Sequence, residues 1–342
     1  MSNNTLQMIR NDCPELLREF LFYMETIRGR SQRTVQGYYI DLRSFLRYIK
    51  SVKMLGVQPA NDDVFHQIKI ADVSAEVICA VTLSDVYEYL HFTLSELKNA
   101  SAARARKVSS IRAFYKYITT KTTLLEDSPV KNLEVPAIKK ALPKYLTLEE
   151  SLELLTNVKS SFTQRDYCII TLFLNCGMRV SELVGINLDD IRYNTLKLLG
   201  KGNKERIVYL NEACISAIKN YLAVRETDVS PGSLSKADKR ALFLSKNGQR
   251  LTVRRVEQIV GQCLTQAGLS GQGYSPHKLR HTAATLMYQH GGVDIRVLKE
   301  ILGHSNLGTT EIYTHVSNEQ IENAADKNPL SAVKKKNSPP IE

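Results

Sequence analysis

The sequence has no Cys-x-x-C pair and no cluster of Cys and His residues at the spacing of metal ligands. Zinc sites and disulfide frameworks both place their ligands or cysteines in closely spaced sets, so neither is expected here. Most of the cysteines lie in apolar stretches, where a free cysteine is usually a small buried hydrophobe. The six are scattered along the chain, at Cys13, Cys79, Cys168, Cys176, Cys214 and Cys263.

Long hydrophobic runs are absent as well. The sequence contains no stretch of about 18 apolar residues, the minimum for a helix that crosses a bilayer. Its start, MSNNTLQMIRND, lacks the basic-then-apolar order of a secretory signal. We therefore expect a cytoplasmic protein without a membrane partner.

Two common signatures of phosphate chemistry are also missing. The glycine-rich turn GKGN does not match the G-x-x-x-x-G-K-[ST] loop that binds nucleotides, and the sequence has no carboxylate cluster of the metal-binding type. A reaction at a phosphate would therefore need side chains to supply the positive charge. We expect neither a metal ion nor another cofactor.

Composition and charge narrow the class of partner. Apolar residues make up 43% of the 342 residues and charged residues 24%, which is typical of a globular protein. The length favours two domains. Forty-six Lys and Arg residues against 35 Asp and Glu residues give a net charge of +11, which suits either a polyanion or an anionic membrane surface.

The N-terminal part predicts a bundle of helices. Apolar residues recur at helical spacing in four segments, at about 14–28, 31–50, 86–97 and 101–119. The intervening stretch 54–82 has no clear period and is expected to be irregular. The fourth helix carries a basic set that could be a solvated face or a DNA contact, namely Arg104, Arg106, Lys107 and Arg112.

A basic stretch with two prolines, LEVPAIKKALPKYL, separates this bundle from the next helix signal. It contains Lys139 and Lys140, which are further candidates for DNA contact. Directly after it, Thr147 and Glu150 have the spacing of a capping box, which marks the start of a new helix. We expect an N-terminal helical domain over 1–132, a linker over 133–145, a second domain over 146–328 and a basic, disordered tail over 329–342.

The hydrophobic period of the second domain changes from helical to strand-like and then back to helical. Residues 165–176 are strongly apolar and end at Gly177, as a buried helix with a glycine cap would. TLKLLGKGNKERIVYL then reads as two strands around a tight turn, and helices dominate again from about residue 250. The predicted fold class is mainly α, with a small β-sheet in the C-terminal domain.

Four segments of the C-terminal half carry side chains that suit chemistry at a phosphodiester, which needs a nucleophile, cations and a proton donor. His277 and Arg280 are three residues apart, so a helix would place both on one face. The candidates are Arg179 in GMRVSEL, Lys201 in GKGN, His277 and Arg280 in SPHKLRH, and His304 and Tyr313 in LGHSNLGTTEIYTH.

Each candidate also has an ordinary structural interpretation. Arg179 could form a surface ion pair with Glu182, three residues further on, and such a pair contributes little. Lys201 could be solvated in its turn, and the two histidines could be hydrogen-bonded structural residues. Tyr313 is one of 16 tyrosines, most of which pack in the interior of a protein.

The six candidates in this order resemble the pattern of the tyrosine recombinases: Arg, Lys, His-x-x-Arg, His or Trp, and Tyr. The resemblance is closest to the Xer type and densest from about 143 to 320, in LPKYL, RDYCIITLF, GMRVSELVG, GKGNKERIV, SPHKLRHTAATL and LGHSNLGTTEIYTHVS. SQRTVQGYYIDLRSFLRYI and ARARKVSSIRAFYKYI are more loosely similar to the family's core-binding domain, which clamps DNA. Cys176 departs from the more usual Thr, and Tyr209 from Pro.

The resemblance implies a site-specific recombinase whose reaction needs neither metal nor ATP. Tyr313 would attack the scissile phosphate, release a 5′-hydroxyl and form a 3′-phosphotyrosyl link. Arg179 and Arg280 would hold the non-bridging oxygens. The other roles would be proton donation by Lys201, handling of the tyrosine proton by His277, a phosphate hydrogen bond from His304 and orientation of Arg179 by Glu182.

The family also implies partners. A double-stranded recombination site would be bound by a homo-tetramer, whose subunits are linked by C-terminal segments, here SNEQIENAADKNPLSAV, and a second recombinase could take part. The same segment could instead be a packing helix of its own subunit. Two other functions stay open: a type IB topoisomerase, and a sequence-specific DNA-binding protein without catalysis.

Overall fold

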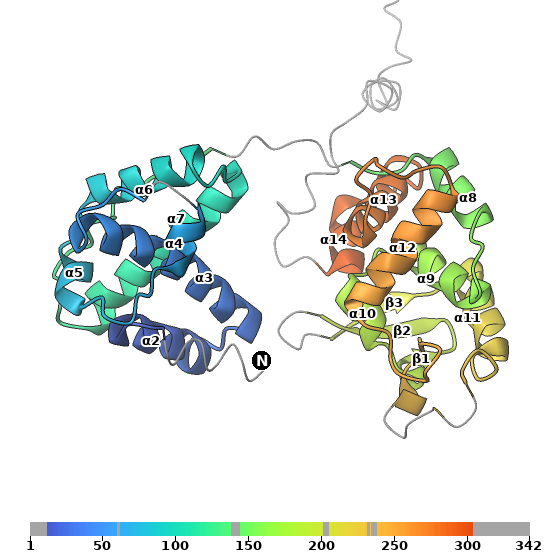
Figure 1. Ribbon diagram of the computed structural model, residues 1–342. Helices are drawn as coiled ribbons and strands as arrows, with labels where there is room; N and C mark the ends of the chain where they lie inside the picture. Colours follow the sequence, from blue (N-terminus) through green and yellow to red (C-terminus); the bar gives the residue numbers. More distant parts are fainter. Residues whose placement is uncertain are drawn as a thin grey trace, which may run out of the picture. The chain divides into compact units, whose positions relative to one another are not determined.

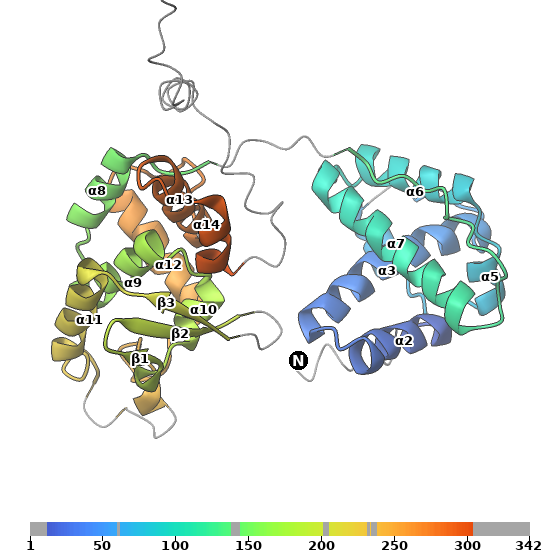
Figure 2. The ribbon, with the colours of Figure 1, turned by 180° about the vertical axis from the view of Figure 1, so that it is seen from behind.

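A computed structural model describes residues 12–59, 62–137, 144–200, 205–230, 233 and 238–303. The chain divides into two compact units, Met1–Lys140 and Ala141–Glu342 (Figures 1 and 2). Each unit encloses its own hydrophobic core. The finer domain limits expected from the sequence stay predictions.

The first unit is helical wherever it has regular structure in the described residues, and the four predicted helices are confirmed. Ser31 caps α3, because its hydroxyl accepts a hydrogen bond from the Thr34 amide at 3.3 Å. The elements are α2 (Glu15–Phe22), the π-helix η1 (Tyr23–Ile27), α3 (Gln32–Lys53), α4 (Asp62–Gln67), α5 (Ala75–Cys79), α6 (Leu83–Ser95) and α7 (Ser101–Lys121).

The prediction that 54–82 is irregular was wrong in part, because α4 and α5 lie within it. Both helices have only one or two turns, so neither repeats an apolar position often enough to give a helical period. Local and tertiary contacts hold α5 instead: Ser74 caps it, and Ile78 is fully buried in the core of the unit.

The second unit combines helices with one small sheet, as the predicted fold class requires. Its elements are α8 (Leu148–Thr156), α9 (Thr163–Cys176), α10 (Val180–Gly185), η2 (Leu188–Asp190), β1 (Ile191–Arg192), β2 (Thr195–Leu199), β3 (Glu205–Tyr209), α11 (Glu212–Val224), η3 (Asp238–Arg240), α12 (Val253–Gln266), α13 (Pro276–Gln289) and α14 (Ile295–Leu302). The capping box of Thr147 and Glu150 opens α8 as predicted.

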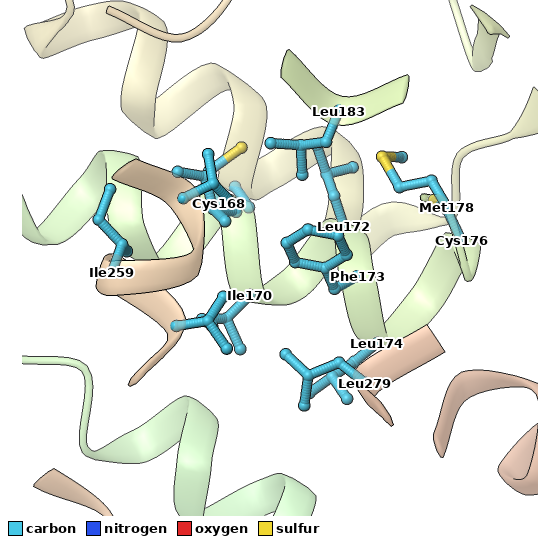
Figure 3. Packing of buried hydrophobic residues seen from close by; sticks show 14 of the residues in the cluster. Cys168, Ile170, Leu172, Phe173, Leu174, Cys176, Met178, Leu183, Ile259 and Leu279 are labelled. Atoms are coloured by element: carbon cyan, nitrogen blue, oxygen red, sulfur yellow. The ribbon is translucent and has the colours of Figure 1, made fainter. Parts of the chain in front are cut away.

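Helix α9 is the centre of this unit. It packs against α11 and α13, and its apolar side chains are buried, including Cys168 and Phe173 (Figure 3). Leu279 of α13 and Ile259 of α12 complete the same cluster. Because most of α9 from Arg165 onward is buried, the helix fixes the position of the turn that follows its last residue.

The sheet is antiparallel, with the order β1-β2-β3. Leu196 pairs with Val208, and both face the core, so the predicted hairpin has its apolar face inward. The turn residues 201–204 lie outside the described residues. The third strand, β1, was not predicted, because two residues are too few to show a strand period.

Gly177 ends α9 in the left-handed region, with φ of 56°. A Cβ at this position would lie 2.8 Å from Cδ2 of Leu302 and 3.6 Å from Cβ of Ala283. The residue therefore has to be glycine for two reasons, its backbone conformation and the close approach of α13 and α14. This packing places the residues after α9 beside the end of α14.

Gly177→Ala should lower the free energy of unfolding by about 1–3 kcal/mol, since it combines a strained φ with overpacking. Urea denaturation followed by circular dichroism measures the change. Gly261→Ala is the matched control: it lies inside α12, where an added Cβ would meet open space, so it should stabilise the protein by about 0.4–1 kcal/mol. Equal effects of the two changes would contradict this account.

Candidate functional site

Arg179 lies at the N-cap of α10, two residues after the glycine that ends α9. Its amide donates to Oε2 of Glu182 at 2.7 Å, and its Nη1 donates to Oε1 of the same carboxylate at 2.8 Å. The Arg179 side chain is 36% exposed, whereas that of Glu182 is 1% exposed. The pair is therefore more than a surface ion pair: a buried carboxylate holds a partly exposed guanidinium.

Glu182 has a second arginine partner that sequence analysis missed. Arg206, on β3, donates from Nη1 to Oε1 at 2.5 Å and from Nη2 to Oε2 at 2.9 Å. Its side chain is 12% exposed. Arg206 is 24 residues from Glu182 in the sequence, so no local spacing connects the two. Its neighbour on β3, Glu205, forms an exposed ion pair with Lys197, so the charges around Arg206 do not indicate the site either.

The carboxylate is held in its charged form. Burial raises the pKa of Glu182, but hydrogen bonds from Arg206 and Arg179, together with the charge of Arg206, outweigh it and leave the pKa below its usual value. Arg280 adds a third guanidinium, with its Nη1 3.9 Å from Oε2. Three cations thus surround one buried anion, and the site carries a net positive charge.

The same three arginines bind the end of α14 through three consecutive backbone carbonyls. Arg206 Nε donates to Ile301 O at 3.2 Å, Arg280 Nη2 to Leu302 O at 2.7 Å, and Arg179 Nη2 to Gly303 O at 3.5 Å. The last four carbonyls of a helix lack partners within the helix, so they are natural acceptors for cations. The next residue in the chain is His304.

Arg280 is 3% exposed, and its guanidinium joins two helix ends. Nη1 donates to Gly177 O at 2.7 Å, and Nη2 donates to Leu302 O. Because a guanidinium carries five N–H donors, it can bind backbone carbonyls and a phosphate at the same time. The structure thus brings Arg179, Glu182 and Arg280 together, as the sequence-based hypothesis requires.

His277 lies one turn before His281 on α13, and their Nε2 atoms are 3.2 Å apart. Burial lowers the pKa of His277, and the charges of Arg280, Lys278 and Arg179 lower it further. Burial, followed by the charge of His277, lowers the pKa of His281 to about 4. His281 was not among the sequence candidates, although its spacing of four residues from His277 in a helix indicates a contact.

Five of the sequence candidates lie outside the residues that the structure describes. They are Lys139, Lys140, Lys201, His304 and Tyr313. Their roles stay predictions.

The basic candidates on α7 are not equivalent. Arg112 is exposed and Arg104 is half-buried. Arg106 donates from Nη1 to Oδ2 of the buried Asp41 at 2.5 Å, although its side chain is 53% exposed. Lys107 is buried, and its ammonium lies 3.7 Å from Oδ1 of the same carboxylate. Burial lowers the pKa of Lys107, while Asp41 acts against the shift.

Within the described part of the chain, no helix is both long and apolar enough to cross a membrane. The same residues contain no group of three or more His, Cys, Asp or Glu side chains placed to hold a metal ion.

Comparison with known proteins finds relatives along most of the chain. The phage integrase family matches residues 144–320, more than half of the sequence. Tyrosine recombinase XerC of Caldanaerobacter subterraneus subsp. tengcongensis is 50% identical over 319 residues, which cover 93% of this chain and 88% of that protein. Tyrosine recombinase XerC of Myxococcus xanthus is 36% identical over 315 residues, which cover 91% and 96%.

Solved structures show the same fold. XerH site-specific recombinase bound to its difH substrate in a pre-cleavage complex superposes with a TM-score of 0.66 and 22% identity, over 95% of this chain and 87% of that chain. A lambda integrase tetramer bound to a Holliday junction gives a TM-score of 0.62 and 17% identity, over 90% and 80%.

The chain therefore belongs to the phage integrase family. It is a site-specific recombinase of the tyrosine type, and the resemblance to Xer recombinases noted in the sequence is confirmed. The comparisons do not favour a type IB topoisomerase or a DNA-binding protein without catalysis.

Proposed function

We propose that this recombinase cuts and rejoins a double-stranded DNA site through a 3′-phosphotyrosyl link on Tyr313, with side chains in place of a metal ion. The observation that carries the proposal is the group of three arginines around Glu182. Their guanidiniums lie at the helix end from which the chain continues to His304 and Tyr313. Such a group can hold a phosphate close to a nucleophile supplied by that segment.

Arg179 and Arg280 bind the non-bridging oxygens of the scissile phosphate in this mechanism. A guanidinium is charged at every accessible pH and binds two oxygens in a planar fork. Arg179 suits the role because it is partly exposed and oriented by Glu182, which also supports the orienting role of that carboxylate. Both arginines stabilise the charge that develops on phosphorus in the transition state.

Tyr313 Oη forms the new bond to phosphorus, and the bond from phosphorus to the sugar O5′ breaks. The phenolic proton passes to His277, and Lys201 gives a proton to O5′, which leaves as a hydroxyl. His304 donates a hydrogen bond to the phosphate. Religation reverses each transfer, so the bond energy is kept in the phosphotyrosyl ester and no ATP is needed.

The low pKa of His277 predicts how cleavage depends on pH. A base acts only when unprotonated, and the neutral form of His277 persists below its usual pKa of 6.5. The acidic limb of kcat/KM should therefore lie below pH 6.5. Lys278→Gln removes one of the charges that lower this pKa, so the limb should move to higher pH. A wild-type limb above 6.5 would contradict the assignment of the base.

The N-terminal unit binds the duplex through the exposed side of α7 in this proposal. Arg104, Arg106 and Arg112 remain candidates for phosphate contact, together with Lys139 and Lys140. Lys107 is a weaker candidate, because its buried ammonium already lies close to Asp41. Such contacts release counterions from DNA, so binding should weaken steeply as salt increases.

We propose a homo-tetramer on two duplexes, in which the C-terminal segments link the subunits to one another. A second recombinase could replace some of the subunits. The lambda integrase tetramer on a Holliday junction, which has the same fold, supports this assembly.

The proposal is tested by trapping the covalent complex on nicked genomic fragments and sequencing the attached ends. A single recurring sequence at the ends, with the protein on the 3′ side of the break, is the expected result. Relaxation of supercoiled DNA by a monomer, without any site requirement, would support topoisomerase activity instead.

A further inference from the structure

We propose that Arg206 is a positioning residue of the recombination site, which fixes both Glu182 and the end of α14 and so sets where the segment after Gly303 begins. This inference rests on the proposed function, because it assigns Arg206 to the placement of the segment that contains His304 and Tyr313. None of the six residues in the recombinase pattern corresponds to Arg206.

The hydrogen bonds of Arg206 connect three parts of the second unit. Its two terminal nitrogens donate to the two oxygens of Glu182, on α10. Its Nε donates to Ile301 O at 3.2 Å, in the last turn of α14. Arg206 itself belongs to β3, so a single side chain joins the sheet to both helices.

Gly303 shows how closely the end of α14 approaches the Arg206 side chain. A Cβ built on Gly303 would lie 2.9 Å from Cδ of Arg206 and 3.3 Å from its Nε. Gly303 also has φ of 64°, a left-handed conformation that ends α14. The helix end therefore lies directly against the aliphatic part and the guanidinium of Arg206.

Only arginine can make this set of contacts. A carboxylate is bound end-on by the two terminal nitrogens, while Nε points to the side and reaches a backbone carbonyl. Lysine has one compact ammonium, so it can bind Glu182 or Ile301 O but cannot brace both in a fixed plane. Without that brace, Glu182 would still hold Arg179, but the end of α14 would lose one of its three arginine contacts, the one that joins it to the sheet.

The alternative is that Arg206 acts only on the hairpin. β3 follows the segment that contains Lys201, so a change at position 206 could impair cleavage by displacing the proton donor. The two explanations predict different responses to the leaving group. A 5′-bridging phosphorothiolate leaves as a thiolate and needs no protonation, so it removes the requirement for Lys201 only.

The test compares single-turnover cleavage of a nicked duplex, carrying the site identified by trapping, with either an ordinary phosphate or a 5′-phosphorothiolate at the scissile position. R206K should cleave both substrates more slowly than wild type, by a similar factor on the order of 10-fold to 100-fold, as for other residues that orient a site. DNA affinity should change far less. Arg206→Gln, which loses the charge as well, should be at least as slow.

Two controls define the comparison. K201A should be slow on the ordinary substrate and recover on the phosphorothiolate; failure to recover would contradict the proposed role of Lys201, independently of Arg206. Arg240→Lys alters an exposed ion pair with Asp189, in which both side chains are 70% exposed, and should cleave like wild type. All variants are compared at a temperature below the onset of their unfolding transitions, so that loss of folded protein does not enter the rates.

The proposal is overturned if R206K and Arg206→Gln cleave the ordinary substrate at the wild-type rate. It is also overturned if the phosphorothiolate restores R206K as it restores K201A, because Arg206 would then act through the hairpin. Equal slowing on both substrates, with DNA binding retained, supports a role in placing the phosphate-binding and nucleophile-bearing elements.

Discussion

Tyr313→Phe should bind its DNA site with unchanged affinity and never become covalently attached to it. The change removes one oxygen, the atom that would bond to phosphorus, and leaves the ring in place. Loss of an enzyme's nucleophile costs on the order of 10⁴-fold or more in rate, so the adduct should fall below detection. Denaturing gel electrophoresis of protein trapped on a nicked duplex measures it.

Tyr209→Phe is the matched control. Tyr209 lies on β3 with 76% of its surface exposed, so losing its hydroxyl should have no effect on adduct formation. A covalent adduct that survives in Tyr313→Phe would show that another residue is the nucleophile. Loss of the adduct in both variants would point to a general effect on the protein.

Arg280→Ala should lower the cleavage rate by on the order of 10²-fold or more, by analogy with the loss of a transition-state donor. The variant also leaves the carbonyls of Gly177 and Leu302 without their arginine, so its free energy of unfolding should fall as well. Arg280→Lys should rescue little, since one ammonium cannot reproduce a fork that joins two helix ends. Single-turnover cleavage at saturating protein measures the rates.

Arg255→Ala removes an exposed arginine of α12 whose guanidinium contacts only Gln258 among the hydrogen bonds that the structure gives for it. It controls for the loss of positive charge and should retain the cleavage rate. Strand exchange that is undiminished in Arg280→Ala would rule out the role assigned to this residue.

Sequence patterns predicted the parts of the fold that depend on local chemistry. The buried helix α9 and its glycine stop, the capping box of Thr147 and the hairpin around GKGN are all set by residues close together in the chain. Short elements escaped prediction, because α4, α5 and β1 are too brief to show a period. Caps, strand pairing and burial hold these elements, and none of these contacts gives a repeating pattern in the sequence.

The residues of the candidate site also differ in whether local sequence patterns could indicate them. Arg179, Glu182, His277 and Arg280 could be found in the sequence because each pair is close in the chain and the order matches a family. Arg206 could not, since its link to Glu182 joins a strand to a helix across 24 residues. Lys107 shows what a charge pattern leaves out: the sequence shows one more cation on α7, whereas the burial of this side chain against Asp41 appears only in the packed bundle.

The most direct test of the account is to identify the atom that holds the DNA. The protein is trapped on a nicked duplex in the presence of EDTA, digested with protease and nuclease, and analysed by mass spectrometry. The account predicts full cleavage without divalent metal and a nucleotide attached to the peptide that contains Tyr313. Cleavage that requires magnesium, or a nucleotide attached to any other residue, would contradict it.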